Sequence, residues 1–307
     1  MKRYPLSPDL AGLPVITAEP WLKIGPGQTF PTMEGADFDR EGNLLVCHRT
    51  RPWSDVVRIS PDRQYETIYH HDDAELIGVA VHKDGRIFAA DINGGGGRLI
   101  ELGPDGSCHR ELCGKRLKPN DLAFDQEGNL YVSDFRGDRN NPSGGIYRLT
   151  QASDYTDMEL TAGGLAAPNG VAFSPDFKLL WTGETTRNCV TRIMLDENRN
   201  LSGNFLSVLT AYQGTGFEVM DSTKVDTLGN VYQAVMYGGR ALVLNNAGIP
   251  IANILLSDRE EGGCMYTPNL AISPDSADGY ILTSGTNGAW IYHFEALAPG
   301  AVLYSHM

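Results

Sequence analysis

Six related phrases in the sequence place polar residues at one recurring position. Each phrase reads as a short apolar segment, a polar turn and a second alternating segment, as in PNDLAFDQEGNLYVSDF from Pro119. The turn residues, in chain order, are Gly42, Gly85, Gly128, Phe177, Gly229 and Gly279. Eight residues before the first five of these lie Glu34, Ile77, Asn120, Asn169 and Asp221; in the sixth phrase an indel leaves Pro268 or Asn269 in this position. Four of the positions therefore carry a carboxylate or a carboxamide at the expected start of the first strand of their phrase.

Oxygen donors that share one register around a ring of repeats would meet on its axis. Two carboxylates placed there would repel each other, and a divalent cation would offset that repulsion. Because the donors are hard oxygens, calcium is the expected ion, with another divalent cation as the alternative. The expected metal ligands are Glu34, Asn120, Asn169, Asp221 and Ser222. Any one of these residues alone is better explained by an Asx turn before a strand, and the shared register of the set is what favours the metal site.

The spacing of the phrases predicts the fold. Successive turn residues are 43 to 52 residues apart, the length of a four-stranded propeller blade. The last phrase is short of strands, whereas an apolar segment around residues 15–24 precedes the first. We therefore expect an all-β, six-bladed β-propeller with four-stranded blades around a central tunnel, closed by an N-terminal strand. The whole chain, residues 1–307, is expected to form this one domain.

Composition narrows the possible partners and location. The chain has 38 acidic and 25 basic side chains and a net charge of −13, which opposes binding to nucleic acid or to an anionic membrane surface. The sequence contains no apolar run of about 18 residues and no apolar core of a secretory signal near its start, and its five cysteines are scattered. We expect a cytoplasmic protein with reduced thiols. The sequence specifies no oligomeric state.

At these residues the sequence resembles the senescence marker protein/gluconolactonase/luciferin-regenerating-like family, and within it the bacterial drug-responsive lactonases. The pieces that carry the resemblance are SDFRG from Ser133, NPSGGIY from Asn141, NGVAFSPD from Asn169, TGETT from Thr182 and the Asp221-Ser222 pair. The resemblance implies an axial calcium on the same residues that the repeat register selects, with Ser222 matching the lactonases. Asn120 departs from those lactonases, which carry an acid there, and this lowers the negative charge of the site by one unit.

The resemblance also implies hydrolysis of a small-molecule lactone, with organophosphate hydrolysis on the same site as an alternative activity. Calcium would polarise the ester carbonyl, and Asp221 is the candidate general base for the attacking water; a hydroxide on the metal is the rival base. A non-catalytic interaction propeller is the alternative from another class, and it predicts a large apolar surface patch. A metal-free propeller similar to strictosidine synthase fits the four-donor register poorly.

Several further residues are candidates for supporting roles. Asp121 and Asp134 are placed to orient ligands or to cap a loop. Side chains expected in loops near the opening are Arg136, Tyr212 and Tyr237. Among the histidines, His48 is the one to test as a base, whereas His82 is expected in a solvated turn.

Overall fold

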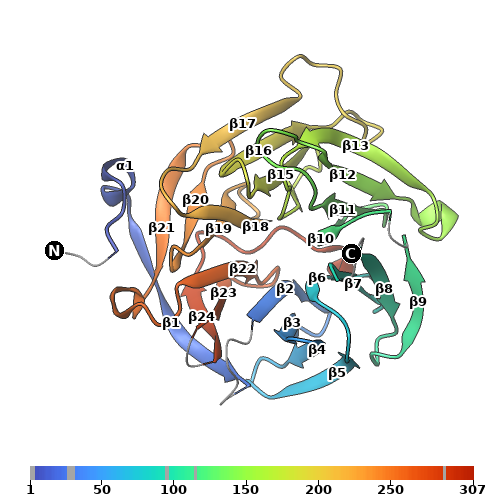
Figure 1. The fold of residues 1–307 in the computed structure, drawn as a ribbon, viewed down its shortest axis with the longest axis horizontal. Helices are drawn as coiled ribbons and strands as arrows, with labels where there is room; N and C mark the ends of the chain where they lie inside the picture. The colour runs from blue at the N-terminus through green and yellow to red at the C-terminus, as the bar shows by residue number, and fades with distance from the viewer. Residues whose placement is uncertain (1–3, 26–31, 94–96, 114–115, 286–287) are drawn as a thin grey trace.

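The computed structural model describes residues 4–25, 32–93, 97–113, 116–285 and 288–307, and these are mostly β-strand. Its one α-helix, α1 (Pro8–Ala11), is a single turn at the periphery (Figure 1). Three short 3-10 turns span Gln151–Ser153, Arg259–Glu261 and Tyr304–His306. Within these described ranges, no helix is long and apolar enough to cross a membrane.

Sixteen strands form four separate four-stranded antiparallel sheets, each a blade arranged around a common centre (Figure 1). The first blade contains β2 (Thr32–Phe38), β3 (Leu44–Thr50), β4 (Trp53–Ile59) and β5 (Tyr65–His71). The second contains β6 (Leu76–Val81), β7 (Ile87–Asp91), β8 (Arg98–Leu102) and β9 (Cys108–Leu112). The third contains β10 (Pro119–Phe124), β11 (Leu130–Asp134), β12 (Gly144–Leu149) and β13 (Met158–Leu165). The fourth contains β14 (Ala172–Phe173), β15 (Leu179–Glu184), β16 (Cys189–Met194) and β17 (Val208–Gln213).

The remaining eight strands form one continuous sheet, so the expectation of six separate blades is wrong. Its strands are β1 (Val15–Ile24), β18 (Val219–Val225), β19 (Val231–Met236), β20 (Arg240–Leu244), β21 (Pro250–Leu256), β22 (Tyr266–Ile272), β23 (Asp278–Ser284) and β24 (Ala289–Glu295). The N-terminal strand β1 causes the fusion because its first half pairs in parallel with β21 and its second half pairs antiparallel with β24. The propeller thus consists of four separate blades and one double-width sheet, and hydrogen bonds to β1 join the two ends of the chain.

The turn of the repeated phrase has the same structure in several blades. In the first, Asp39 Oδ1 accepts hydrogen bonds from the backbone N–H groups of Glu41 (3.1 Å) and Asn43 (2.9 Å). Five of the six predicted turn residues have a left-handed backbone conformation, with φ between 56° and 88°: Gly42, Gly85, Gly128, Phe177 and Gly229. Gly279 differs because it lies inside β23. The repeat register is therefore real in five phrases and displaced in the sixth.

A β-bulge interrupts five of the innermost strands near the recurring polar position. The register shifts fall at Glu34/Ala36 in β2, Leu76/Gly78 in β6, Pro119/Leu122 in β10, Met220/Thr223 in β18 and Tyr266/Asn269 in β22. A bulge bends the strand and changes the direction of a side chain. The bulges therefore bring polar residues of separate blades toward the centre, where β2, β6, β10, β18 and β22 are seen to gather (Figure 1).

Glycines allow these inner strands to approach one another closely. A Cβ atom on Gly78 would lie 2.1 Å from the carbonyl oxygen of Asn120, and one on Gly170 would lie 2.1 Å from the backbone nitrogen of Thr223. No real Cβ tolerates backbone atoms at such distances, so the spacing of the blades at the axis depends on these glycines.

Aromatic side chains packed between blades overturn a second expectation, the solvent exposure of His82. Phe88, Phe124 and Tyr155 form T-shaped contacts between the second and third blades, with centroids 4.9 and 5.4 Å from Phe88. His82 packs edge-on against Phe124 and Tyr304 and is only 2% exposed. The expectation of a solvated His82 is therefore wrong, because aromatic side chains and the C-terminal segment cover this turn. Burial lowers the pKa of His82.

Gly78→Ala should destabilise the propeller, because the added methyl group overlaps the Asn120 carbonyl. Overpacking of this kind typically costs about 1–3 kcal/mol. The melting temperature, measured by circular dichroism, should fall clearly relative to wild type. Gly203→Ala is the matched control, since a Cβ there meets no atom within 4 Å; equal melting temperatures for the two variants would contradict the close packing of the inner strands.

Candidate metal and substrate site

The five predicted ligands are all buried near the centre of the ring. Their exposed fractions are 7% for Glu34, 8% for Asn120, 5% for Asn169, 4% for Asp221 and 1% for Ser222. Each lies at or directly before a bulged or short inner strand, and Asn169 precedes β14 next to the isolated bridge between Pro168 and Glu184. Buried polar residues need partners, so the contacts of each decide what this cluster can do.

The carboxylates of Glu34 and Asp221 interact with each other although their strands are far apart in the sequence. Burial raises the pKa of Glu34 well above its usual range, and repulsion from Asp221 raises it further, while Arg49 acts in the opposite direction. Burial likewise raises the pKa of Asp221, and a hydrogen bond from Asn169 opposes that rise. Two buried carboxylates so close are unstable as a charged pair unless a cation lies near them.

Asn169 provides an oxygen without a partner. Its Nδ2 donates to Thr185 Oγ1 at 3.3 Å and its amide also interacts with Asp221, but its buried Oδ1 has no hydrogen-bond partner among the described residues. A buried acceptor left in this way costs about 1–3 kcal/mol. A cation beside Asp221 would satisfy it.

Asn269 belongs to the same cluster and was only one of two options for the sixth repeat position. Its Nδ2 donates to Ser222 Oγ at 2.7 Å, and its side chain also hydrogen-bonds with Glu34. The indel in the sixth phrase obscured the register, which is why the sequence did not separate Asn269 from Pro268. The bulge between Tyr266 and Asn269 marks the residue that faces the others.

Asn120 lies at the equivalent bulge of β10, beside Asp121. The Asp121 carboxylate is close enough to raise the pKa of both Glu34 and Asp221. Its own oxygens accept from the backbone N–H groups of Leu122 (2.9 Å) and Val171 (3.2 Å), and Lys224 Nζ is 3.9 Å from Oδ2. Asp121 therefore connects neighbouring inner strands. We refer to the buried residues Glu34, Asn120, Asn169, Asp221, Ser222 and Asn269 as the axial cluster.

The axial cluster fits a hard cation better than a soft one. It combines the carboxylates of Glu34 and Asp221 with carboxamide and hydroxyl oxygens, all of which are hard donors. Calcium readily takes mixed carboxylate, amide and water ligands. The donors, the repulsion and the unpartnered Asn169 oxygen are all consistent with such an ion.

A cavity of about 680 Å³ is linked to this cluster through Tyr266 and Arg49, which line the cavity and interact electrostatically with Glu34 and Asp221. Its lining includes Arg49, Arg51, Tyr237, Met265 and Tyr266. Repulsion from Glu34 and Asp221 contributes to the raised pKa of Tyr266, after burial, so this tyrosine joins the cavity wall to the axial carboxylates. The cavity has room for a small molecule.

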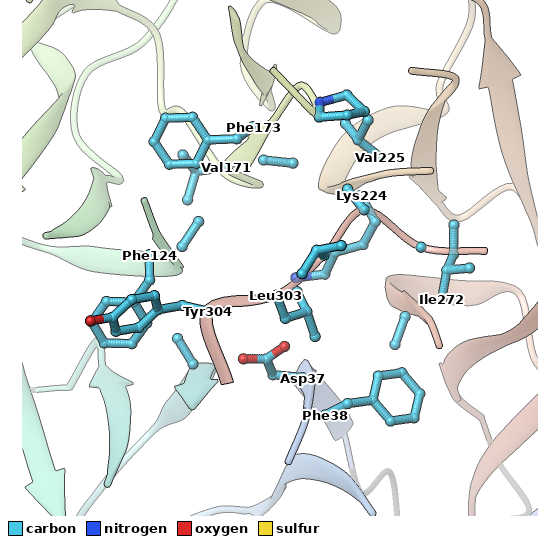
Figure 2. Close-up of a pocket in the computed structure, with 18 of the residues that line it drawn as sticks. Asp37, Phe38, Phe124, Val171, Phe173, Lys224, Val225, Ile272, Leu303 and Tyr304 are labelled. Carbon is cyan, nitrogen blue, oxygen red and sulfur yellow. The ribbon is translucent and has the colours of Figure 1, made fainter. Parts of the chain in front are cut away.

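A second cavity, of about 170 Å³, lies farther along the inner strands and is largely apolar. Figure 2 shows Asp37 and Lys224 pointing into it, with Leu303 and Tyr304 of the C-terminal segment at its wall. Burial raises the pKa of Asp37 to about 6, against the opposing effects of Lys224 and of the hydrogen bond from Val81 N–H. Because C-terminal residues cover it, we assign this cavity to the core of the ring.

Among the other candidate residues, one lines the 680 Å³ cavity and three make contacts elsewhere. Tyr237 lines the 680 Å³ cavity, whereas Tyr212 packs against the apolar cluster that contains Val190 and Met220. Arg136 donates to the Arg116 carbonyl at 2.9 Å. His48 packs against Trp53, with its Nδ1 3.9 Å from Asp55.

Asp134 also has a structural contact. Its Oδ1 accepts from the backbone N–H of Lys118 at 2.7 Å. Asp91 and Glu184 make the same kind of contact in neighbouring blades, with the N–H groups of Glu75 and Ala166. This acid therefore fixes the loop that enters the inner strand.

Comparison with known proteins identifies the family. Residues 109–260 match the SMP-30/Gluconolactonase/LRE-like region. The chain is 33% identical over 301 residues to Lactonase drp35 of Staphylococcus saprophyticus, covering 95% of this chain and 91% of that protein. It is 31% identical to the Staphylococcus aureus protein of the same name, with 94% and 90% covered. The chain belongs to the SMP-30/gluconolactonase/LRE-like family. The resemblance inferred from the sequence is confirmed.

Solved structures of more distant proteins share the fold. A luciferin-regenerating enzyme superposes with a TM-score of 0.70 at 16% identity, covering 92% of this chain and 96% of that one. A calcium-binding protein, regucalcin, from Agrobacterium tumefaciens gives 0.69 at 16% identity, covering 94% and 98%. At this identity the likeness concerns the propeller architecture.

The raised pKa of Asp37 predicts how stability varies with pH in chelator-treated protein. Between the ordinary aspartate value near 4 and about 6, the folded state binds more protons than the unfolded state. Stability contributed by this group is therefore complete below pH 4 and lost as pH rises through 6. A shift of about two pKa units corresponds to about 3 kcal/mol.

Urea unfolding at pH 4, 5, 6 and 7 in EDTA measures the free energy of unfolding. This free energy should decrease less with rising pH in Asp37→Asn than in wild type. Asparagine keeps an acceptor for the Val81 N–H, so the variant should fold. Asp62→Asn removes an exposed carboxylate of the same blade and is the control, expected to follow wild type. If the free energy of unfolding of Asp37→Asn depends on pH as strongly as that of wild type, the raised pKa of Asp37 is not the cause of the pH dependence.

Proposed function

We propose that this protein is a calcium-dependent lactone hydrolase. The observation that carries the proposal is the buried Glu34–Asp221 pair beside the unpartnered Asn169 oxygen. Tyr266, which interacts electrostatically with both carboxylates, lines a cavity large enough for a small lactone. The relatives named lactonase support the reaction class, and the regucalcin named as a calcium-binding protein supports the choice of ion. The residues that would hold the ion are Glu34, Asn120, Asn169, Asp221 and Ser222.

The ion, when bound, supplies polarisation of the ester carbonyl and charge stabilisation for the oxyanion. Asp221 is the proposed general base: its carboxylate accepts a proton from the water that attacks the carbonyl carbon. The ring C–O bond then breaks, and the same carboxyl returns the proton to the departing alkoxide, giving the open hydroxy acid. A nearby cation favours the charged form of Asp221 and so offsets the effect of burial on its pKa.

Other residues of the chain position this base. Asn169 hydrogen-bonds with Asp221, and Gln233 Nε2 donates to the backbone carbonyls of Asp221 (2.9 Å) and Ser222 (3.1 Å). Asn269 binds the Ser222 hydroxyl. These contacts fix the bulge of β18 and hold the carboxylate in one orientation, which proton transfer requires.

Removal of calcium and replacement of the base separate the two parts of the proposal. EDTA should abolish hydrolysis of a neutral γ-lactone, and added calcium should restore it. Asp221→Asn should retain bound calcium, measured by atomic emission, while kcat falls at least about 100-fold, the usual minimum contribution of a positioned base. Near-normal turnover in this variant would exclude Asp221 as the base, and full activity in EDTA would exclude the ion.

Asn120→Asp tests the charge of the ion site. A third carboxylate at this bulge should tighten calcium binding at least about tenfold in isothermal titration, because it adds a unit of negative charge in a desolvated place. Asn204→Asp, on an exposed outer loop, introduces the same charge away from the axis and should leave the calcium affinity unchanged. Equal affinities in all three proteins would place Asn120 outside the ion site.

A further inference from the structure

Two arginines in the wall of the 680 Å³ cavity share a single carboxylate. Arg51 Nε lies 2.8 Å from Glu75 Oε1, and Arg49 Nη1 lies 3.6 Å from Glu75 Oε2. Two guanidinium groups therefore face one carboxylate at this wall. Arg49 also interacts electrostatically with Glu34 and Asp221, whose negative charge a bound divalent cation would offset.

Arg49 is the more enclosed of the two and the one directed toward the axial cluster. Its side chain is 14% exposed, compared with 75% for Arg51, and it lies at the end of β3 facing the cavity. Its charge reaches both Glu34 and Asp221. Among the described residues its one ion pair is with Glu75, at a separation longer than a hydrogen bond. A planar guanidinium in this situation is suited to a carboxylate from outside the chain.

The remainder of the cavity wall has a different character. Tyr237 and Tyr266 pack edge to face with centroids 5.5 Å apart, and Phe217, 81% exposed, packs on Tyr237 at 5.4 Å. Met265, Gly262, Gly263 and Gly285 add apolar or small residues. The cavity thus has an aromatic side for the body of a ligand and one localised cationic position.

We propose that Arg49 and Arg51 make this enzyme selective for lactones that carry a free carboxylate. The carboxylate binds at the guanidinium pair, the ring lies against Tyr237 and Tyr266, and the ester carbonyl reaches the axial cluster. Glu75 limits the strength of this anion site because it competes for both guanidinium groups. The inference rests on the proposed lactonase function and adds the substrate class.

The test compares two lactones that differ in one charge: γ-carboxy-γ-butyrolactone and its methyl ester. Wild-type protein, saturated with calcium, should hydrolyse the free acid with a kcat/KM at least about tenfold higher than the ester, mainly through KM, because a charge-assisted hydrogen bond contributes roughly this much. The preference should decrease with added salt, since one partner of the pair is exposed.

Two variants that should change the substrate preference in opposite directions make the test specific. Arg49→Gln should reduce the acid-to-ester preference to about unity, whereas Glu75→Gln should increase it, because both arginines are then released. Arg63→Gln removes one positive charge from the turn after β4, at the end of the first blade away from Arg49, and should retain the wild-type preference. Calcium affinity measured for each variant shows whether a change in preference comes from loss of the ion.

The outcomes distinguish this inference from the proposed function. Hydrolysis of both lactones with equal kcat/KM, or an Arg49→Gln variant that keeps the wild-type preference, would overturn the carboxylate selectivity while leaving the lactonase proposal intact. Failure to hydrolyse either lactone in calcium-loaded protein would overturn both.

Discussion

The repulsion between the buried carboxylates of Glu34 and Asp221 is the constraint on which the centre of this molecule depends. Glu34 is buried on an inner strand of the first blade and Asp221 on an inner strand of the double-width sheet, and repulsion from Asp221 adds to the effect of burial in raising the pKa of Glu34. A fold does not keep two such groups together without compensation. Arg49 provides part of it and the amides of Asn169 and Asn269 another part, and a divalent cation is the simplest remaining source.

Backbone geometry holds these side chains in place. Bulges near the recurring position turn polar residues of separate strands toward one point, and glycines such as Gly78 let neighbouring inner strands come within contact distance of their backbones. The site is therefore a property of the ring and not of any one blade. Side chains held by sheet and bulge are more precisely positioned than side chains on free loops, and the proposed role of Asp221 as a general base requires such positioning.

Much of this could be predicted from the sequence because the phrases repeat. The shared register identified Glu34, Asn169 and Asp221 as neighbours, and the structure places them within interaction distance of one another or of the same groups. In the sixth phrase the indel left the recurring position to either Pro268 or Asn269, so the register did not identify Asn269 by itself. Arg49 was also missed, because it lies at the far end of the second strand of its blade, outside the recurring position.

The other errors came from contacts that no local pattern contains. The double pairing of β1 merges two sheets that the repeat count separates, and His82 is buried by Tyr304, more than 200 residues away along the chain. The contacts of the C-terminal segment also bear on the order in which the protein folds. Ser305 hydrogen-bonds with the Phe38 carbonyl, and Arg40 with the carbonyl of Met307, so contacts across 267 residues of sequence pack residues 305–307 on the first blade. Because residues 305–307 follow every strand of the propeller in the chain, the first blade gains these contacts only after all the other blades have been synthesised.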